Sequence, residues 1–173
     1  MTVSGSFTTA SALSPNLSLQ NVVAQVTDFS FSDGINTYAF ADSNSRMYLF
    51  AVTTNGSGQI TAYEILIELW TSGTSPHSSG DRFSYMFITN GNTLAFNNSR
   101  CVGVGPGNSG VADSCDSENP DSSRSAASGP AGTWTSSSPV PTLGEWGMIL
   151  LAGLLILYGR SRIRRQDGVA QAA

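Results

Sequence analysis

The side chains best suited to catalysis in this chain of 173 residues surround its single histidine. His77 lies in the run 75–81, SPHSSGD, which brings together the three residue types of a serine hydrolase. A catalytic triad depends on geometry across the fold, however, and not on proximity along the chain. Pro76 and Gly80 favour a loop between strands at this point. A small secreted hydrolase is therefore only the third of three functional hypotheses.

The two cysteines are the next candidates for chemistry. Cys101 and Cys115 enclose thirteen residues, with no second cysteine pair and no histidine nearby, so neither a redox CxxC motif nor a zinc site is indicated. In an oxidising compartment this spacing predicts one disulfide, which would contribute about 3 kcal/mol by the chain-entropy model. Two free thiols are the alternative.

An acidic stretch beside Cys115 raises the question of calcium, which takes carboxylate ligands in extracellular proteins. It consists of Asp113, Asp116, Glu118 and Asp121. The stretch lacks the glycine and the ligand order of an EF-hand, so a solvated acidic loop is the preferred interpretation. The glycines of 103–107 precede neither a basic residue nor a helix, which excludes a phosphate loop. We predict no metal, no cofactor and no enzymatic activity.

The C-terminal part carries a different kind of motif. The run 140–146, VPTLGEW, leads into the apolar stretch 148–158, and four arginines follow: Arg160, Arg162, Arg164 and Arg165. Thr142 and Glu145 have the spacing of a capping box, which predicts a helix that starts at Leu143. A helix over 143–159 would be about 25 Å long, slightly less than the ~30 Å hydrocarbon core of a bilayer.

We predict that this helix spans a membrane. A buried core helix is the alternative, but an apolar stretch that is hydrophobic all round suits lipid better than a surface stripe. Trp146 and Tyr158 lie near its two ends, where aromatic side chains favour the headgroup level. The arginine cluster would form the stop and lie in the cytoplasm, with 166–173 as a cytoplasmic tail. The long N-terminal part is then outside.

Motif, span and arginine cluster together resemble the IPTL-CTERM sorting signal, a tag on exported proteins of Gram-negative bacteria that an exosortase-type membrane protease reads. The resemblance implies recognition of the motif and cleavage near it, with the membrane and the protease as partners. The residues concerned are Val140, Pro141, Thr142 and Leu143, followed by Glu145 and Trp146. Val140 replaces the isoleucine of the family name and keeps its β-branch. The implied location is the inner membrane during sorting, with the body outside the cytoplasm, and then the envelope or the extracellular space.

The N-terminal residues do not supply the expected export signal. Residues 1–15 contain neither a basic n-region nor an apolar h-region. We expect such a signal to be encoded upstream of Met1. A tail-anchored protein with a cytoplasmic body is the alternative.

Composition agrees with an exported body that does not bind nucleic acid. The chain has no lysine, and residues 1–139 carry ten acidic and four basic side chains. An acidic body with scattered arginines lacks the basic patch that nucleic acids require.

The body reads as short strands joined by tight turns. Segments 28–32 and 35–41 flank Asp33-Gly34, a dipeptide typical of a type I′ hairpin. A strand over 46–54 ends in the turn 55–58, NGSG. A second hairpin joins 81–89 to 92–97 through Asn90-Gly91.

The segment 59–70 fits either a helix or a strand by composition. A helix would place Glu64 and Glu68 four residues apart, where like charges repel. A strand places Tyr63, Ile65 and Ile67 on one face, and this alternation favours the strand. The prediction is an all-β domain, a small antiparallel β-sandwich or meander.

The predicted organisation has four parts: a β-domain over 1–102, a disordered Gly/Ser/Pro-rich linker with a disulfide loop over 103–139, the sorting motif and transmembrane helix over 140–165, and the tail over 166–173. The leading hypothesis is an exported structural or adhesive protein of the envelope or extracellular matrix. The second is a carbohydrate- or ligand-binding β-sandwich with extracellular polysaccharide as partner, which exposed Trp70, Tyr63 or Tyr85 would favour.

Overall fold

The computed structural model describes residues 2–106, 110–135 and 151. Within these ranges no helix has the length and apolar character needed to cross a bilayer. The predicted sorting motif, transmembrane helix, arginine cluster and tail lie outside the described residues, apart from Leu151.

The described chain is all-β and antiparallel, as the sequence predicted, with one short 3-10 turn. Its elements are β1 (Ser4–Thr9), β2 (Gln20–Asn21), η1 (Val23–Gln25), β3 (Val26–Ser32), β4 (Thr37–Ala39), β5 (Ser45–Thr54), β6 (Ile60–Trp70), β7 (Arg82–Thr89), β8 (Asn92–Gly105), β9 (Ser114–Asn119) and β10 (Ser125–Pro130).

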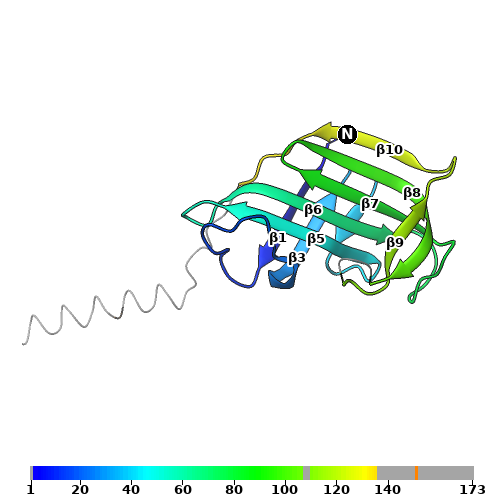
Figure 1. Ribbon diagram of the computed structural model, residues 1–173, viewed down its shortest axis with the longest axis horizontal. Coiled ribbons are helices and arrows are strands. Elements are labelled where there is room, and N and C mark those ends of the chain that lie inside the picture. The colour runs from blue at the N-terminus through cyan, green and yellow to red at the C-terminus, as the bar shows by residue number, and fades with distance from the viewer. Residues whose placement is uncertain (1, 107–109, 136–150, 152–173) are drawn as a thin grey trace, which may run out of the picture. The chain divides into compact units, whose positions relative to one another are not determined.

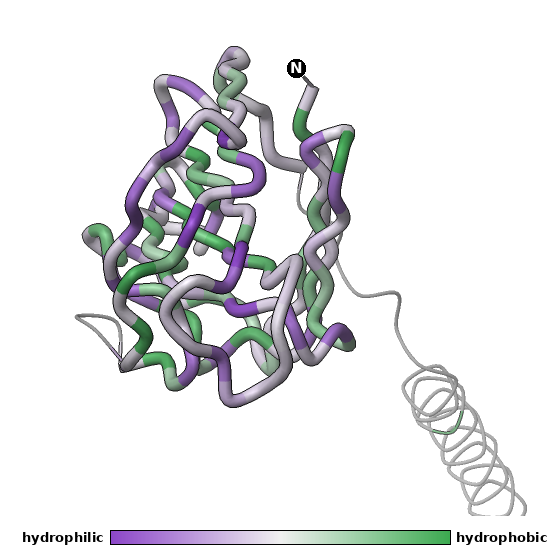
Figure 2. The backbone as a smooth tube through the Cα atoms, turned by 90° about the vertical axis from the view of Figure 1, so that its right-hand side faces the viewer, coloured by the Kyte–Doolittle hydropathy of each residue, from purple (hydrophilic) through white to green (hydrophobic). Residues whose placement is uncertain are grey.

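Two sheets make up the body (Figure 1). The small sheet has the strand order β1-β3-β4, and the large one has the order β10-β8-β7-β6-β5-β2, with β9 paired to β8 beside that path. Strands β5 to β8 follow one another as a meander, because each pairs with the next along the chain. Figure 2 shows the N-terminal strands as a separate layer beside the larger sheet.

A hydrophobic core joins the two sheets into a sandwich. Phe29, Phe31 and Tyr38 of the small sheet are buried in the same cluster as Phe50 and Ile65 of the large sheet. Burial of each such side chain contributes about 1.5–3 kcal/mol. A polar contact adds to this core, because the amide of Asn36 donates to that of Asn97 on β8.

The hairpin at Asp33-Gly34 forms where it was predicted, but its turn type is different. Ser32 pairs with Thr37, which leaves a four-residue loop where a type I′ turn needs two residues. Only Gly34 of the dipeptide has a positive φ, of 89°. The Asp33 carboxylate instead accepts hydrogen bonds from the backbone N–H of Ile35 and Asn36 at 2.8 and 2.7 Å. This side-chain capping stabilises the longer loop.

The segment 59–70 is a strand, and the predicted alternation is confirmed. Tyr63, Ile65 and Ile67 of β6 are buried in the core between the sheets. Glu68 and Trp70 lie on the opposite face, yet they are only 4% and 3% exposed. The alternation of residue types in β6 does not predict burial on both faces at this end of the strand.

The prediction of a disordered linker over 103–139 is wrong for most of that range. Strand β8 runs to Gly105, and β9 and β10 lie within the predicted linker. Their residues are mostly small and polar, but each strand pairs antiparallel with β8. Main-chain pairing to a strand that is already fixed does not require apolar side chains. The compact unit accordingly runs from Met1 to Trp134, so the boundary at 102 is wrong, and 136–139 lie outside the described residues.

Candidate functional site

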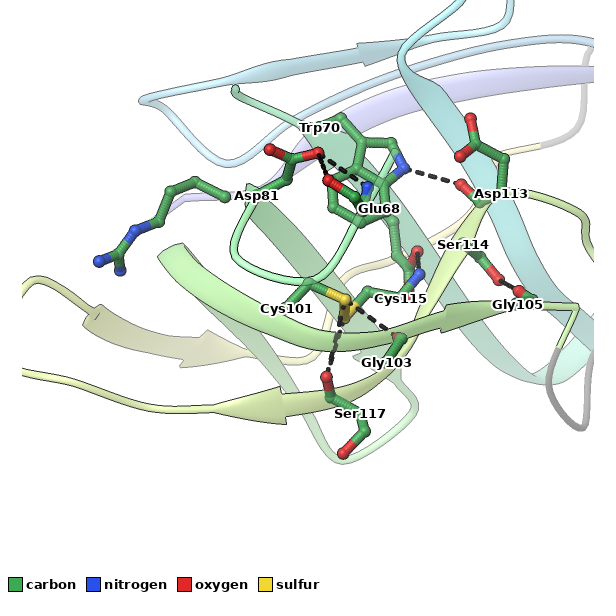
Figure 3. Close-up of a disulfide and its surroundings, with 12 residues drawn as sticks. Glu68, Trp70, Asp81, Cys101, Gly103, Gly105, Asp113, Ser114, Cys115 and Ser117 are labelled. Carbon is green, nitrogen blue, oxygen red and sulfur yellow. Dashed lines mark hydrogen bonds between the residues drawn. A yellow bond between two sulfur atoms is a disulfide. The ribbon is translucent and has the colours of Figure 1, made fainter. Parts of the chain in front are cut away.

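Five polar or aromatic side chains meet at the C-terminal end of β6, on the outer face of the large sheet. We call Arg46, Glu68, Trp70, His77 and Asp113 the polar cluster. Strand β6 supplies Glu68 and Trp70, β5 supplies Arg46, and the loops before β7 and β9 supply His77 and Asp113. Figure 3 shows Glu68, Trp70 and Asp113 beside the disulfide.

His77 is fixed on three sides. Its backbone N–H donates to Asp113 Oδ1 at 2.6 Å, and its ring Nδ1 lies 3.0 Å from Asp113 Oδ2. The imidazole stacks on the Trp70 indole with 4.2 Å between ring centroids and 4° between planes. Its Nε2 is buried and has no hydrogen-bond partner among the described residues.

Asp113 connects three elements through one carboxylate and one carbonyl. Arg46 Nη2 lies 3.0 Å from Asp113 Oδ2, and Trp70 Nε1 donates to the Asp113 carbonyl at 2.8 Å. Burial acts to raise the pKa of Asp113, but hydrogen bonds from His77 and Ser75 outweigh it and lower the pKa to about 2. The carboxylate is therefore ionised at neutral pH.

Glu68 is the buried acid of the cluster. The backbone N–H of Cys115 donates to its Oε2 at 3.0 Å. Burial raises the pKa of Glu68 to about 7, although this hydrogen bond and the charge of Arg46 act in the opposite direction. The Glu68 carboxyl group therefore titrates close to neutral pH.

The disulfide lies next to this acid. Cys101 of β8 and Cys115 of β9 are joined, which is the pairing that the sequence predicted. Both sulfurs belong to a second hydrophobic cluster with Trp70 and Phe83. The bond therefore fixes β9 over the end of β6, where its backbone covers Glu68.

The arrangement does not form the hydrolase site suggested by the run 75–81. Asp81 accepts from the backbone N–H and the hydroxyl of Ser78, while His77 pairs with Asp113, thirty-six residues away. The second ring nitrogen of His77, Nε2, is buried. The described contacts of His77 and Asp113 join the loops before β7 and β9.

The acidic stretch does not gather into a cation site in the described part of the chain. Asp113 pairs with Arg46, Glu118 with Arg124 and Asp121 with Arg82. No group of three or more metal-ligating side chains occurs among the residues the structure describes. Arg46 and Arg82 come from strands that are distant in the sequence, so the sequence offered no signal for their pairs, whereas Arg124 lies six residues after Glu118.

Of the three aromatic residues proposed for ligand binding, Trp70 and Tyr63 are buried and Tyr85 is half-buried. Trp70 and Tyr63 are 3% and 6% exposed. Tyr85 stacks between Phe83 and Phe96, and its hydroxyl donates to Glu118 at 2.9 Å. Trp70 and Tyr63 therefore do not form an open platform for a sugar ring.

Comparison with known families gives an assignment for the C-terminal part. Residues 138–165 match the model described as the IPTL-CTERM motif. The chain carries this sorting motif. The match includes the predicted processing residues and the four arginines of the stop. It implies a secreted protein, exported to the cell envelope or the extracellular space, and processing by an exosortase-type membrane protease.

The body has no such assignment. Neither the curated proteins nor the solved structures contain a match to this chain. The role of the sandwich must therefore be argued from its own residues.

Proposed function

We propose that this protein is a structural or adhesive component of the cell envelope or extracellular matrix, delivered by its IPTL-CTERM signal. The observation that carries the proposal is the match at 138–165, which directly follows a compact β-sandwich. In this proposal the segment 143–159 spans the inner membrane during sorting, and the body lies outside the cytoplasm.

The disulfide supports an extracytoplasmic body. Disulfides persist in oxidising compartments and are rare in the cytoplasm. Because Cys101 and Cys115 are paired and buried with Trp70 and Phe83, the bond is part of the folded body.

The polar cluster supports a role without catalysis. Its histidine is closed to solvent, and its aspartate holds an arginine and two loops. A body whose loops are joined in this way fits a structural component. The covered Trp70 and Tyr63 give the ligand-binding alternative no support, and we do not propose a polysaccharide partner.

The test compares two substitutions in the motif by pulse-chase immunoblot of the full chain, in a host that contains the cognate exosortase. We expect Pro141→Ala to block processing and leave a full-length, membrane-retained form. Thr142→Ala removes the helix cap, which is usually worth about 1 kcal/mol, and should leave most processing intact.

The two variants separate recognition by a protease from simple helix initiation. Loss of a cap should not prevent insertion of so apolar a span. Equal processing of both variants and the wild type would exclude the sorting function and leave a plain C-terminal anchor.

A further inference from the structure

The chain folds back onto the sandwich after its last strand. We call residues 131–134 the C-terminal strap. At its start, the Thr93 hydroxyl donates to the Pro130 carbonyl at 3.2 Å, and the Tyr63 hydroxyl donates to the Gly132 carbonyl at 3.0 Å. The strap is thus attached to the large sheet before it reaches Trp134.

Trp134 anchors the strap between the two sheets. Its ring meets Phe7 of β1, Phe31 of β3 and Tyr63 of β6 at centroid distances of 5.4, 6.3 and 5.2 Å. All three contacts are edge-to-face, which is a favoured geometry for aromatic pairs. The indole packs against the main core, whose members include Phe31 and Tyr63.

One polar atom opposes this docking. Trp134 Nε1 is buried and has no acceptor within the described ranges. A buried N–H without a partner opposes burial, and it regains a hydrogen bond in water when the ring leaves. The strap is therefore a candidate for local opening without unfolding of the sheets.

The position of Trp134 limits the chain available to a protease. Trp134 stands seven residues before Pro141, a stretch that spans at most about 25 Å when fully extended. If the strap opens back to Pro130, eleven residues are available, or about 40 Å. A protease that binds several extended residues before the cleaved bond would meet the folded body in the first case and free chain in the second.

We propose that the docked strap limits access of the exosortase-type protease to the motif, so that Trp134 controls the rate of processing. This inference rests on the proposed function and assigns a regulatory role to the body. In this proposal Trp134 is the group that occupies the space between Phe7, Phe31 and Tyr63.

The test is pulse-chase processing of the full chain in the exosortase host. Trp134→Ala should be processed about fivefold faster than the wild type, because the strap is then open most of the time. Insertion of six Gly/Ser residues after Thr135 should accelerate processing to a similar extent while Trp134 stays docked. Trp134→Phe should stay close to the wild type.

Phe40→Ala is the matched control, since Phe40 is also aromatic but is 54% exposed and contacts Phe29. It should be processed at the wild-type rate. The insertion variant keeps the test decisive if Trp134→Ala folds poorly. Wild-type rates for both Trp134→Ala and the insertion would overturn the proposal.

A separate measurement tests whether Trp134 is docked, independently of processing. In purified full-length protein, chymotrypsin should cut after Trp134 about tenfold more slowly than in a synthetic peptide of residues 128–140, because cleavage requires local opening. Equal rates would overturn the docking. Protection at Trp134 in a protein that the host does not process would overturn the proposed function, and with it the regulatory role, while the docking would stand.

Discussion

Glu68 is an ionisable side chain in a position with almost no access to water. It is 4% exposed, and the N–H of Cys115 satisfies one of its oxygens. Arg46 pairs with Asp113 and not with Glu68, so the buried acid has no direct ion pair among the described residues. Its charged form is therefore disfavoured near neutral pH.

The first prediction concerns the pH dependence that follows. The native pKa of Glu68 is about 7, above the ordinary glutamate value of 4.5. The folded state thus holds this proton more tightly, so the stability it contributes is complete below pH 4.5 and is lost as the pH rises through 7. Between pH 4.5 and 8 the free energy of unfolding of the wild type should fall as Glu68 ionises. In Glu68→Gln, which cannot titrate, we expect this fall to be smaller by up to about 3 kcal/mol.

Urea unfolding of both proteins at several pH values measures this difference. Glu64→Gln is the matched control, because Glu64 lies on the same face of β6 but is more exposed. A Glu68→Gln variant with the same pH profile as the wild type would show that the buried carboxylate does not titrate in this range.

At the level of elements, the strands with apolar alternation were predictable, and those without it were not. Strand β6 was predicted from the spacing of Tyr63, Ile65 and Ile67, because burial of one face imposes a period of two. Strands β9 and β10 carry mainly serine, alanine and acidic residues and have no such period. Their conformation depends on pairing with β8, which local sequence does not encode.

Turn position and turn type also differ in how far the sequence determines them. Asp33-Gly34 marked the place of a reversal, because both residue types favour turns. The loop length depends on which strand residues pair, and the Ser32–Thr37 pair sets it at four. The contacts of the polar cluster are likewise not determined by local sequence, since His77 and Asp113 meet only when two separate loops are folded.

The second prediction concerns the hairpin of β8 and β9. The free energy of unfolding of the double variant Cys101→Ser/Cys115→Ser should be about 3 kcal/mol lower than that of the oxidised wild type. The reason is that a closed loop no longer restricts the unfolded chain. Thermal or urea unfolding without reductant measures the loss. Ser43→Ala/Ser57→Ala, which changes two exposed positions outside this hairpin, controls for simple substitution effects.

Reduction of the wild type gives an independent comparison. Reductant should bring the wild type to the stability of the double variant and leave the variant unchanged. Equal stability of the oxidised wild type and the variant would mean that the bond does not stabilise the body.

At the scale of the whole molecule, the body ends at Trp134 and not at 102. Removal of residues beyond 102 would delete β9, β10, the Trp134 anchor and one half of the disulfide. It would also leave β8 paired with β7 alone, because β9 and β10 would be missing, and would remove the Cys115 N–H that binds Glu68. The folded unit therefore includes most of what the sequence indicated as linker.

The third prediction follows from that boundary. A fragment of residues 1–135 should fold alone and unfold in one cooperative transition, as single domains of this size usually do. A fragment of residues 1–102 should fail to do so. Circular dichroism with urea titration distinguishes them, and a cooperative transition for 1–102 would restore the shorter boundary.

The disulfide also has a consequence for the order of events during export. In a reducing cytoplasm Cys101 and Cys115 remain thiols, so β9 is held over Glu68 by non-covalent contacts alone. We expect the newly made body to open more readily in that state, which suits a chain that must cross a membrane. Oxidation on the far side then secures the hairpin and makes the step hard to reverse. The bond between β8 and β9 would in this way oppose backward movement through the membrane. Its redox state would differ between molecules that folded in the cytoplasm and molecules that folded outside it.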